Sequence, residues 1–486
     1  MPGNANSAEQ RRQRELVEAL RSPDAYPHPV GRVEVLETHI STVLLAGEFA
    51  YKLKKPVDLG FVDFTTLEQR RFYCAEEIRV NARAAPTLYL GIVPITIHDG
   101  RVRMGNGGDP LEFAVRMRRF PQDALLAEVA RKGPLPPALV DRMADVVAAM
   151  HDSAPVAAPD SEAGQASVIR ERMEENFQSL AELPLNSAVL RTVEALRGHA
   201  DAHWKRLAPV MKRRRDDGRV RECHGDLRWI DTASDLAFLL MDLRNRDQPT
   251  AANRLLSRYL ELTGDYSALG VIDFYVAYRA MVRAKIEGIR WNEARDSDAA
   301  AAIESALRRY LELAGRPSAP PRLLVITHGV SGSGKSTVAE AMVERFGYIR
   351  LRSDVERKRA FGLHRLAGSA SGTGQGIYTE DATELTYQRL GDLARTAVEA
   401  GHVPVVDASF LKASARAEFE RLADELQAEF RILDVRADDD VIRRRLRQRA
   451  GAGNEPSEAD ERILDHQLAT RDPLTDWEKA HAVTVD

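Results

Sequence analysis

The sequence of 486 residues has little of what marks secreted or membrane proteins. Its two cysteines, Cys74 and Cys223, are too few for a disulfide framework, which favours a reducing compartment. No apolar run is long enough to cross a membrane, and the first residues lack the charged and apolar regions of a secretory signal. We therefore expect a cytoplasmic protein without a membrane partner.

A large excess of charge of one sign is also missing. The 69 basic and 73 acidic residues give a net charge of −4, so the chain as a whole does not attract nucleic acid. Its length exceeds that of one ordinary hydrophobic core, which predicts two or three domains. The composition does not set an oligomeric state.

A glycine-rich stretch at residues 329–337 is the strongest motif in the chain. It reads Gly329-Val330-Ser331-Gly332-Ser333-Gly334-Lys335-Ser336-Thr337. The apolar run before it, residues 323–327, predicts a buried strand, and residues 338–344 after it predict a helix. Strand, glycine loop and helix form the context in which the pattern G-x-x-x-x-G-K-[ST] is a phosphate site.

Each residue type in this loop has a physical reason to be there. Glycines let the backbone N–H groups point at an anion, and the helix start adds the positive end of its dipole. We expect the whole stretch to bind ATP, with Lys335 reaching the β- and γ-phosphates and the Ser336 hydroxyl binding Mg²⁺. The alternative, a glycine turn that binds nothing, is disfavoured because the loop and both flanks agree.

Two carboxylates follow predicted strands of the same region. Asp354 comes just after residues 346–351, and such a group could accept a proton from an acceptor hydroxyl. Arg357, on the same helical face, could hold an acceptor or a phosphate. Asp407 ends the apolar residues 402–406, the position of a carboxylate that holds Mg²⁺. The simpler alternatives are a helix cap for Asp354 and an ordinary strand end for Asp407.

An arginine-rich helix is predicted over residues 440–450. A run of charge is usually a solvated face, but one or two arginines could close over a triphosphate. Arg445 and Arg449 share a face at a spacing of four residues, and we select them as lid residues for the nucleotide site.

These features together resemble the small P-loop kinases, such as polynucleotide kinase, gluconate kinase, chloramphenicol phosphotransferase and zeta-toxin-type kinases. The resemblance covers residues 322–486 and implies an α/β domain with a parallel sheet. It implies transfer of the ATP γ-phosphate to a hydroxyl, with Asp354 as base, Arg357 at the acceptor or a phosphate, and the arginines of residues 443–449 as a lid. The acceptor stays open, and the net charge favours a small molecule over a polynucleotide.

A linker of prolines and small residues at 314–321 precedes this domain and predicts a division into residues 1–315 and 322–486. The first part predicts strands at 33–45 and 49–56 around a turn at Gly47, a helix at 67–84, further strands, and helices from 135 onward.

A second motif resembles the catalytic loop of the aminoglycoside phosphotransferases. It reads Glu222-Cys223-His224-Gly225-Asp226-Leu227. The resemblance implies an α+β kinase-like domain, a small β lobe plus a helical lobe. It implies Asp226 as catalytic base and, as the phosphate-binding pair, Lys52 or Lys54 with Glu76 or Glu77.

The pattern then departs from that family. The fifth residue after Asp226 is Asp231 where the family has Asn, and residues 229–243 predict a helix that leaves no room for the family's strand pair. Asp231 or Asp235 could replace the lost metal ligands, or both could be helix-start or helix-face carboxylates. We therefore expect the first half to keep the fold with degenerate catalysis.

The lead prediction is an ATP- and Mg²⁺-dependent small-molecule kinase run by the C-terminal domain. One alternative is an ATP-gated binding or regulatory protein without net transfer. Another is an antibiotic phosphotransferase that uses Asp226.

Overall fold

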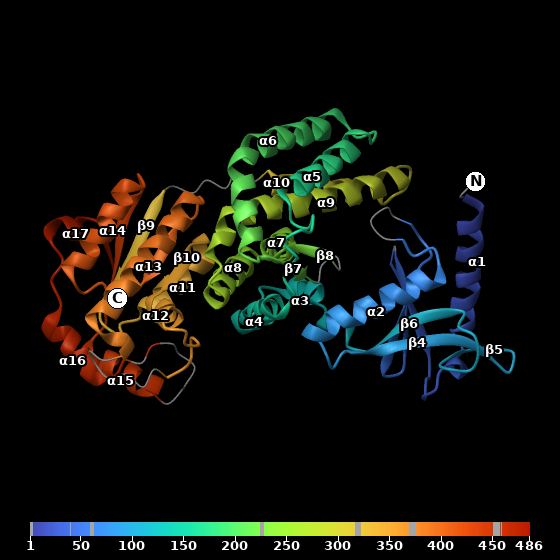
Figure 1. The fold of residues 1–486 in the computed structure, drawn as a ribbon, viewed down its shortest axis with the longest axis horizontal. Helices are drawn as coiled ribbons and strands as arrows, with labels where there is room; N and C mark the ends of the chain where they lie inside the picture. The colour runs from blue at the N-terminus through green and yellow to red at the C-terminus, as the bar shows by residue number, and fades with distance from the viewer. Residues whose placement is uncertain are drawn as a thin grey trace. The chain divides into compact units, whose positions relative to one another are not determined.

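The computed structural model describes residues 3–38, 40–58, 63–223, 228–315, 322–368, 376–450, 457 and 459–486. The chain forms two compact units (Figure 1). Unit 1 holds residues 1–132 with 222–228, and unit 2 holds residues 133–221 with 229–486. Residues 316–321 of the linker predicted at 314–321 lie outside the described residues, and the division drawn there stays a prediction.

Unit 1 is built on a six-stranded sheet in the order β1-β2-β3-β6-β4-β5, with antiparallel neighbours. The strands are β1 Val33–Glu37, β2 Ser41–Ala46, β3 Phe49–Lys54, β4 Tyr89–His98, β5 Arg101–Met104 and β6 Glu112–Arg118. The helices α1 Gly3–Ala19 and α2 Leu67–Ala84 pack on this sheet. Side chains alternate along β6, so Ala114 joins the core with α1 while Phe113 and Val115 join the core with α2.

The first predicted strand, residues 33–45, is wrong in one respect, because it is two strands. The chain reverses after Glu37, where the Thr38 N–H donates to the Ser41 carbonyl at 2.9 Å and the Ser41 N–H donates to Thr38 Oγ1 at 3.0 Å. A threonine hydroxyl that bonds a nearby backbone N–H favours such a turn over continued pairing. The second turn, at Gly47, is confirmed by its φ of +57° and by the pairing of β2 with β3.

Residues 133–315 are mainly helical, with one short strand pair between α6 and α7. Its main helices are α4 Pro137–Ser153, α5 Ala166–Ala181, α6 Ser187–Asp216, α7 Thr232–Asn245, α8 Pro249–Thr263, α9 Ile272–Glu293 and α10 Ala300–Ala314. The strands β7 Val220–Cys223 and β8 Arg228–Asp231 pair with each other just before α7. The helix predicted at 229–243 starts three residues later in the structure, at Thr232, because Trp229 to Asp231 belong to β8.

The rest of unit 2 is an α/β domain with a five-stranded parallel sheet in the order β10-β11-β9-β12-β13. Its strands are β9 Leu323–His328, β10 Ile349–Arg352, β11 Pro404–Asp407, β12 Glu429–Val435 and β13 Ala482–Val485. Its helices include α11 Lys335–Phe346, α12 Ser353–Ala360, α13 Glu380–Glu399, α14 Ala413–Glu425, α15 Asp439–Ala450 and α16 Glu461–Thr470. The predicted classes, α+β followed by α/β, are both confirmed.

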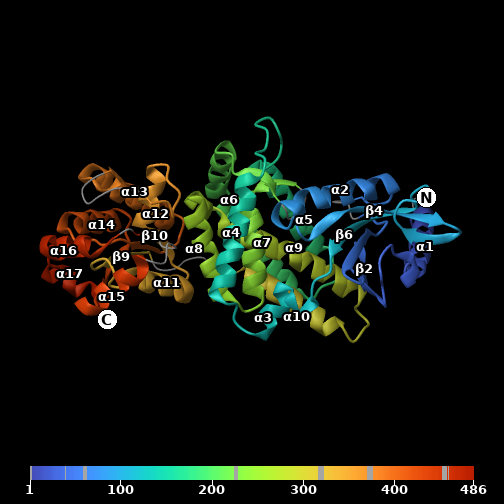
Figure 2. The ribbon, with the colours of Figure 1, turned by 90° about the horizontal axis from the view of Figure 1, so that it is seen from below.

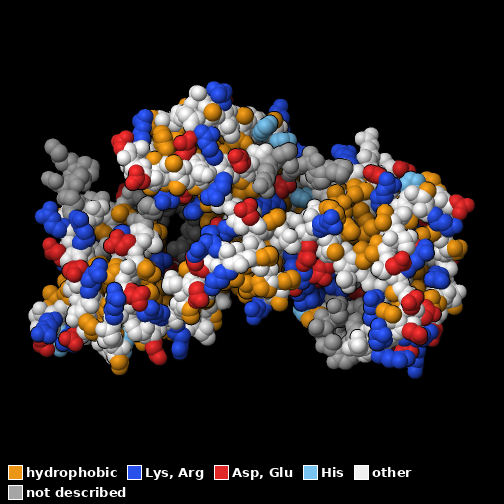
Figure 3. All heavy atoms as spheres, turned by 180° about the vertical axis from the view of Figure 1, so that it is seen from behind, with side chains coloured by type: hydrophobic (Ala, Val, Ile, Leu, Met, Phe, Trp, Pro, Cys, Tyr) orange, Lys and Arg blue, Asp and Glu red, His pale blue; other side chains and the backbone are white. Residues whose placement is uncertain are grey.

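Helix α8 links the helical part of unit 2 to the parallel sheet. It packs against α11 and β10, which lie beside it in both ribbon views (Figure 2). Charges of both signs are interspersed on the face in Figure 3, consistent with the small net charge. No helix among the described residues has the length and apolarity to span a membrane.

Candidate active site

The glycine-rich loop lies between β9 and α11, as predicted. Gly329 has a φ of +142°, and a Cβ there would lie 2.5 Å from the Val435 carbonyl oxygen. Gly332 and Gly334 also have positive φ, at +86° and +111°. Residues with a side chain rarely adopt this backbone, so the loop's curled path depends on glycine at these positions.

The loop is closed by hydrogen bonds around the Val330 carbonyl. Lys335 Nζ donates to this oxygen at 2.8 Å, and the Ser333 N–H donates to it at 3.2 Å. The Ser331 N–H donates to Gln467 Oε1 of α16 at 2.8 Å. The protein itself therefore holds the loop in the curved form that a phosphate group requires.

One arginine of the predicted lid reaches the loop. Arg445 Nη1 of α15 donates to the carbonyls of Gly332 at 3.3 Å and Ser333 at 3.0 Å. Arg443 and Arg447 turn instead toward Glu461 of α16. The side chain of Arg449, the second predicted lid residue, lies outside the described part.

Three neighbouring strands bring the predicted polar residues to one edge of the sheet. β10, β11 and β9 are adjacent, and Arg352 at the end of β10 pairs in register with Asp407 at the end of β11. Asp407 is buried, and its Oδ2 accepts no hydrogen bond among the described residues. Arg352 Nε lies 3.8 Å from this oxygen.

This edge fits a magnesium ion and a triphosphate on its own chemistry. A buried carboxylate oxygen without a donor is costly unless a cation or a water completes it. Asp407 and the Ser336 hydroxyl are hard oxygen ligands of the kind Mg²⁺ takes. The loop supplies backbone N–H groups at a helix start, where anions are favoured.

Asp354 and Arg357 lie on α12 but have different surroundings. Asp354 is in the first turn, partly exposed, and is paired with no described residue. Arg357 is buried and donates from Nη1 to the Ile377 carbonyl at 3.0 Å and to Thr383 Oγ1 at 3.2 Å. Its guanidinium therefore ties α12 to the start of α13, and its predicted contact with an acceptor stays a prediction.

In unit 1 the structure distinguishes between the two predicted glutamates, while both predicted lysines take part in the contact. Glu77 of α2 pairs with both lysines of β3, with Lys52 Nζ at 2.8 Å and also with Lys54. Burial opposes ionisation of Glu77, yet the two ammonium groups lower the pKa of its carboxyl. Glu76 pairs with Arg79 instead. Asp226 lies in the 224–227 segment, outside the described residues.

Asp231 and Asp235 both have protein partners in unit 2. Asp231 accepts from Arg214 Nη2 at 2.7 Å and Nε at 2.9 Å, and it caps α7 by accepting from the Ala233 N–H at 2.8 Å. Asp235 Oδ2 lies 2.9 Å from His151 Nε2. For Asp231 the helix-start alternative weighed from the sequence is confirmed.

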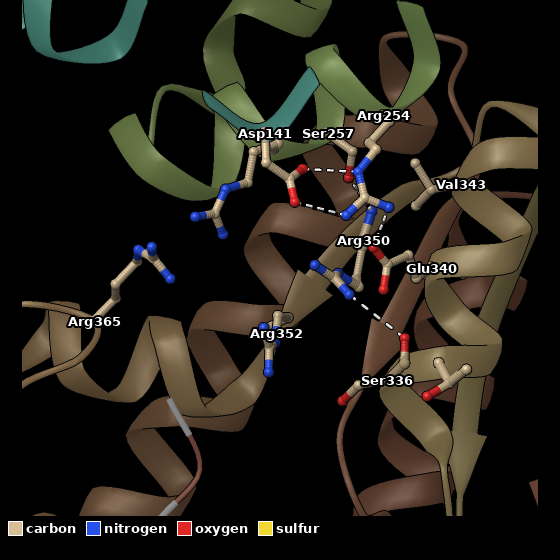
Figure 4. A pocket seen from close by; sticks show the side chains of 11 residues that line it. Asp141, Arg254, Ser257, Ser336, Glu340, Val343, Arg350, Arg352 and Arg365 are labelled. Atoms are coloured by element: carbon tan, nitrogen blue, oxygen red, sulfur yellow. Dashed lines mark hydrogen bonds and ion pairs between the residues drawn. The ribbon is translucent and has the colours of Figure 1, made fainter. Parts of the chain in front are cut away.

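A cavity beside the loop was not predicted. It has a volume of about 270 Å³ and is bounded by α8, β10 and the start of α11 (Figure 4). Its walls carry Arg254, Arg258, Arg350, Arg352 and Arg365, with Ser336 and Thr337 at the loop side. The available signal was spacing: the α8 arginines are four residues apart and the β10 arginines two apart, so each pair shares a face.

Glu261, near the end of α8, binds three of these arginines. It is 1% exposed and lies 2.9 Å from Arg350 Nη2, 3.1 Å from Arg258 Nη1 and 3.8 Å from Arg352 Nη1. Burial opposes its charge, but the guanidinium groups lower the pKa of the Glu261 carboxyl. One buried carboxylate thus holds the end of α8 to β10.

Comparisons with known proteins cover both parts of the chain. Residues 324–474 match a family model described as an AAA domain. Uncharacterized proteins of Mycobacterium bovis and Mycobacterium tuberculosis are 29% identical over 485 residues, covering 94% of this chain and 93% of theirs.

Three solved structures are similar to parts of the chain. A gluconokinase from Sinorhizobium meliloti is 23% identical, with a TM-score of 0.25, over 34% of this chain and 82% of its own. A choline/ethanolamine kinase family protein from Mesorhizobium loti is 14% identical, with a TM-score of 0.37, over 63% and 95%. Aminoglycoside 2′-phosphotransferase-IIIa is 16% identical, with a TM-score of 0.35, over 62% and 98%.

The resemblance predicted for residues 322–486 is confirmed by the family match and by the parallel sheet. The preceding half has the expected antiparallel sheet with its lysine–glutamate contact, followed by helices. The chain therefore joins a first half with an antiparallel sheet and many helices to a P-loop domain that matches the AAA-domain model.

Proposed function

We propose that this protein is an ATP- and Mg²⁺-dependent phosphotransferase whose P-loop domain moves the γ-phosphate to a hydroxyl of a small molecule. The observation that carries the proposal is the shared edge of three adjacent strands. The loop after β9 brings Ser336, β11 ends at Asp407, and α12 after β10 brings Asp354. Open α/β sheets bind their ligands at this edge.

The loop binds the nucleotide in this proposal. Its backbone N–H groups and Lys335 neutralise the β- and γ-phosphates, and Ser336 and Asp407 hold the metal. Mg²⁺ would supply charge neutralisation on the phosphate oxygens. Arg445, which bonds the loop carbonyls of Gly332 and Ser333, is the arginine positioned to stabilise charge as it develops.

Asp354 receives the acceptor's proton. The bond from the γ-phosphorus to the β,γ-bridging oxygen breaks, a bond from that phosphorus to the acceptor oxygen forms, and ADP leaves with the bridging electrons. Asp354 is free for this role because no described residue pairs with its carboxylate. A small acceptor is supported by the net charge of −4 and by the mixed charges in Figure 3.

A second candidate function is phosphotransfer by the first half with Asp226 as base. The contact of Glu77 with Lys52 and Lys54 favours it, because kinases use such a pair to position phosphates. Against it stands Asp231, which fills the position of the family's metal-binding Asn but is bound to Arg214. We propose that this half binds or presents the acceptor.

The test measures transfer from γ-labelled ATP, with Mg²⁺, into a small-molecule extract. Lys335→Ala should lower labelling by about a thousandfold or more, because the phosphates lose their main cation. Lys479→Ala, an exposed lysine of the same domain, is the matched control and should keep full activity. Labelling that survives Lys335→Ala but disappears with Asp226→Ala would contradict the proposal and favour the second candidate.

A different negative result points to the remaining alternative. If the wild-type protein binds ATP but labels no acceptor, the protein is an ATP-gated binding or regulatory protein. Binding is read from retention of labelled ATP, with Lys335→Ala as the negative control.

A further inference from the structure

Five arginines line the cavity beside the loop, and the carboxylates around them are unevenly shared. One of its arginines, Arg254, is fully neutralised: it lies 2.7 Å from Asp141, 2.6 Å from Glu344, and also pairs with Glu340. This group braces α8 against α11 and α4. The carboxylates of this group pair with Arg254 and with no other cavity arginine among the described residues.

Three of the other cavity arginines contact the same carboxylate. Arg258, Arg350 and Arg352 all depend on Glu261. Arg258 also approaches the half-exposed Asp145 at 3.2 Å. Arg352 approaches Asp407 at 3.8 Å, and that carboxylate is assigned to the metal in the proposed function. These three arginines therefore share one buried carboxylate.

Arg365 is the fifth arginine of this cavity. It projects into the cavity from the segment after α12, and it makes no hydrogen bond or ion pair with the described residues (Figure 4). Burial and the nearby Arg258 lower the pKa of its guanidinium. A cation placed beside other cations is unfavourable unless an anion joins them.

Unused hydrogen-bond donors mark the same place. The Nε atoms of Arg258, Arg350 and Arg365 are buried and have no acceptor within the described structure. Buried donors nearly always find a partner, and leaving one unpaired costs about 1–3 kcal/mol. Three such donors around one cavity indicate an acceptor group that carries several oxygens.

We propose that this cavity binds a phosphate group of the acceptor, so that the substrate is a small phosphate-bearing alcohol. The inference rests on the proposed function for its place in the reaction. Guanidinium groups match phosphate oxygens in pairs, and convergence of several arginines suits a dianion better than a single carboxylate. A cavity of about 270 Å³ admits a phosphate with a short carbon chain.

The position of the cavity fits an acceptor. Ser336 and Thr337, at the end of the nucleotide loop, form part of its wall, and Arg352 lies between the cavity and Asp407. An anion held there is beside the proposed metal site and outside the loop. Its phosphate would anchor the acceptor while a separate hydroxyl reacts.

The test is equilibrium dialysis of radiolabelled inorganic phosphate against the full chain. A non-hydrolysable ATP analogue with Mg²⁺ is present at saturation, so that the loop is already filled. We expect phosphate to bind, and Arg365→Gln to weaken binding by about tenfold or more, because a charged donor is lost. Arg365 has no partner in the described structure, so its replacement should leave folding intact.

The matched control is Arg395→Gln, on the exposed side of α13 in the same domain. It should bind phosphate as the wild-type protein does. Arg365→Glu, which places a carboxylate in the cavity, should abolish binding. Phosphate monoesters should displace the label at concentrations where acetate does not.

Several results would overturn the inference. They are the absence of bound phosphate, equal affinity in wild type and Arg365→Gln, and displacement by acetate as efficient as by phosphate monoesters. A parallel loss of affinity for the ATP analogue in Arg365→Gln would also overturn it, because the cavity would then serve the nucleotide.

The dialysis separates this inference from the proposed function, since it needs no phosphate transfer. Phosphate binding that depends on Arg365 in a protein with no transferase activity would contradict the proposed function alone. Transfer that is lost in Lys335→Ala, together with no phosphate binding in the cavity, would contradict the inference alone.

Discussion

Two aspartates each end a strand in unit 2, and they have opposite surroundings. Asp231 ends β8 with both oxygens engaged, by Arg214 and by the first turn of α7. Asp407 ends β11 with one buried oxygen that accepts no described hydrogen bond. A carboxylate at a strand end is therefore a candidate metal ligand only when the fold leaves an oxygen unused. The same position is structural in the first case and suited to chemistry in the second.

The largest expected effect is on stability, at Asp231. Asp231→Asn removes one partner of a buried ion pair and should lower the free energy of unfolding by about 3–5 kcal/mol. Urea denaturation measures it. Asp216→Asn, which breaks the exposed pair with Lys212, should cost no more than about 1 kcal/mol. If Asp231→Asn lowered the free energy of unfolding by less than about 1 kcal/mol, Asp231 would not have the structural role that distinguishes it from Asp407.

The next effect is on activity, at Asp407. Asp407→Asn should lower the rate of phosphate transfer by about 10²–10³-fold, because a charged ligand at the reacting phosphate is lost. Its unfolding free energy should change by less than about 1 kcal/mol, because Oδ2 accepts no hydrogen bond among the described residues and its ion pair with Arg352 is 3.8 Å long. Asp424→Asn, exposed on α14, is the control. Full activity in Asp407→Asn would disprove the metal role.

Low pH should lower the stability that comes from the ion pairs of Arg214 with Asp231 and Asp265. Burial opposes the charge of Asp265, but the Arg214 guanidinium, 2.8 Å away, lowers the pKa of its carboxyl. A carboxyl with a lowered native pKa gives stability that is complete above its unfolded pKa and is lost as pH falls through its native pKa. Stability should therefore fall below about pH 4, the usual range for Asp.

The control for this acid effect is Asp265→Asn. Its unfolding free energy, measured by urea titration from pH 7 to pH 3, should fall less steeply than that of the wild-type protein. Equal slopes would show that Asp265 does not contribute to the acid sensitivity.

The smallest effect concerns the last neighbour of Asp231. The Tyr275 hydroxyl donates to Asp231 Oδ2 across 3.5 Å, a long and weak contact. Tyr275→Phe should change the free energy of unfolding by less than about 1 kcal/mol. A larger loss, measured by urea denaturation beside Asp231→Asn, would mean that the tyrosine shares in holding the carboxylate.

Local patterns in the sequence predicted the parts of the site that neighbouring residues determine. The loop at 329–337 and the strand ending at Asp407 are recognisable because their signals lie within a few residues. The pair β7 and β8 was missed because four residues give too little periodicity to distinguish a strand from the start of a helix.

The contacts of Arg357 and Glu261 could not be predicted, because their partners are distant in the sequence. Arg357 bonds residues about 20 positions further along the chain, and Glu261 contacts arginines almost 90 positions away. Helical spacing predicted that Arg357 shares a helix face with Asp354. Only packing against α13 determines where the Arg357 guanidinium lies.

The three contacts of Glu261 limit how the chain can be divided. A fragment that begins at residue 322 would keep Arg350 and Arg352 but lose the carboxylate that both of them contact. Such a fragment would expose two arginines, and Glu340 and Glu344 of α11 would lose their partner Arg254 of α8. Residues up to 315 and residues from 322, produced as two separate chains, should therefore associate with each other.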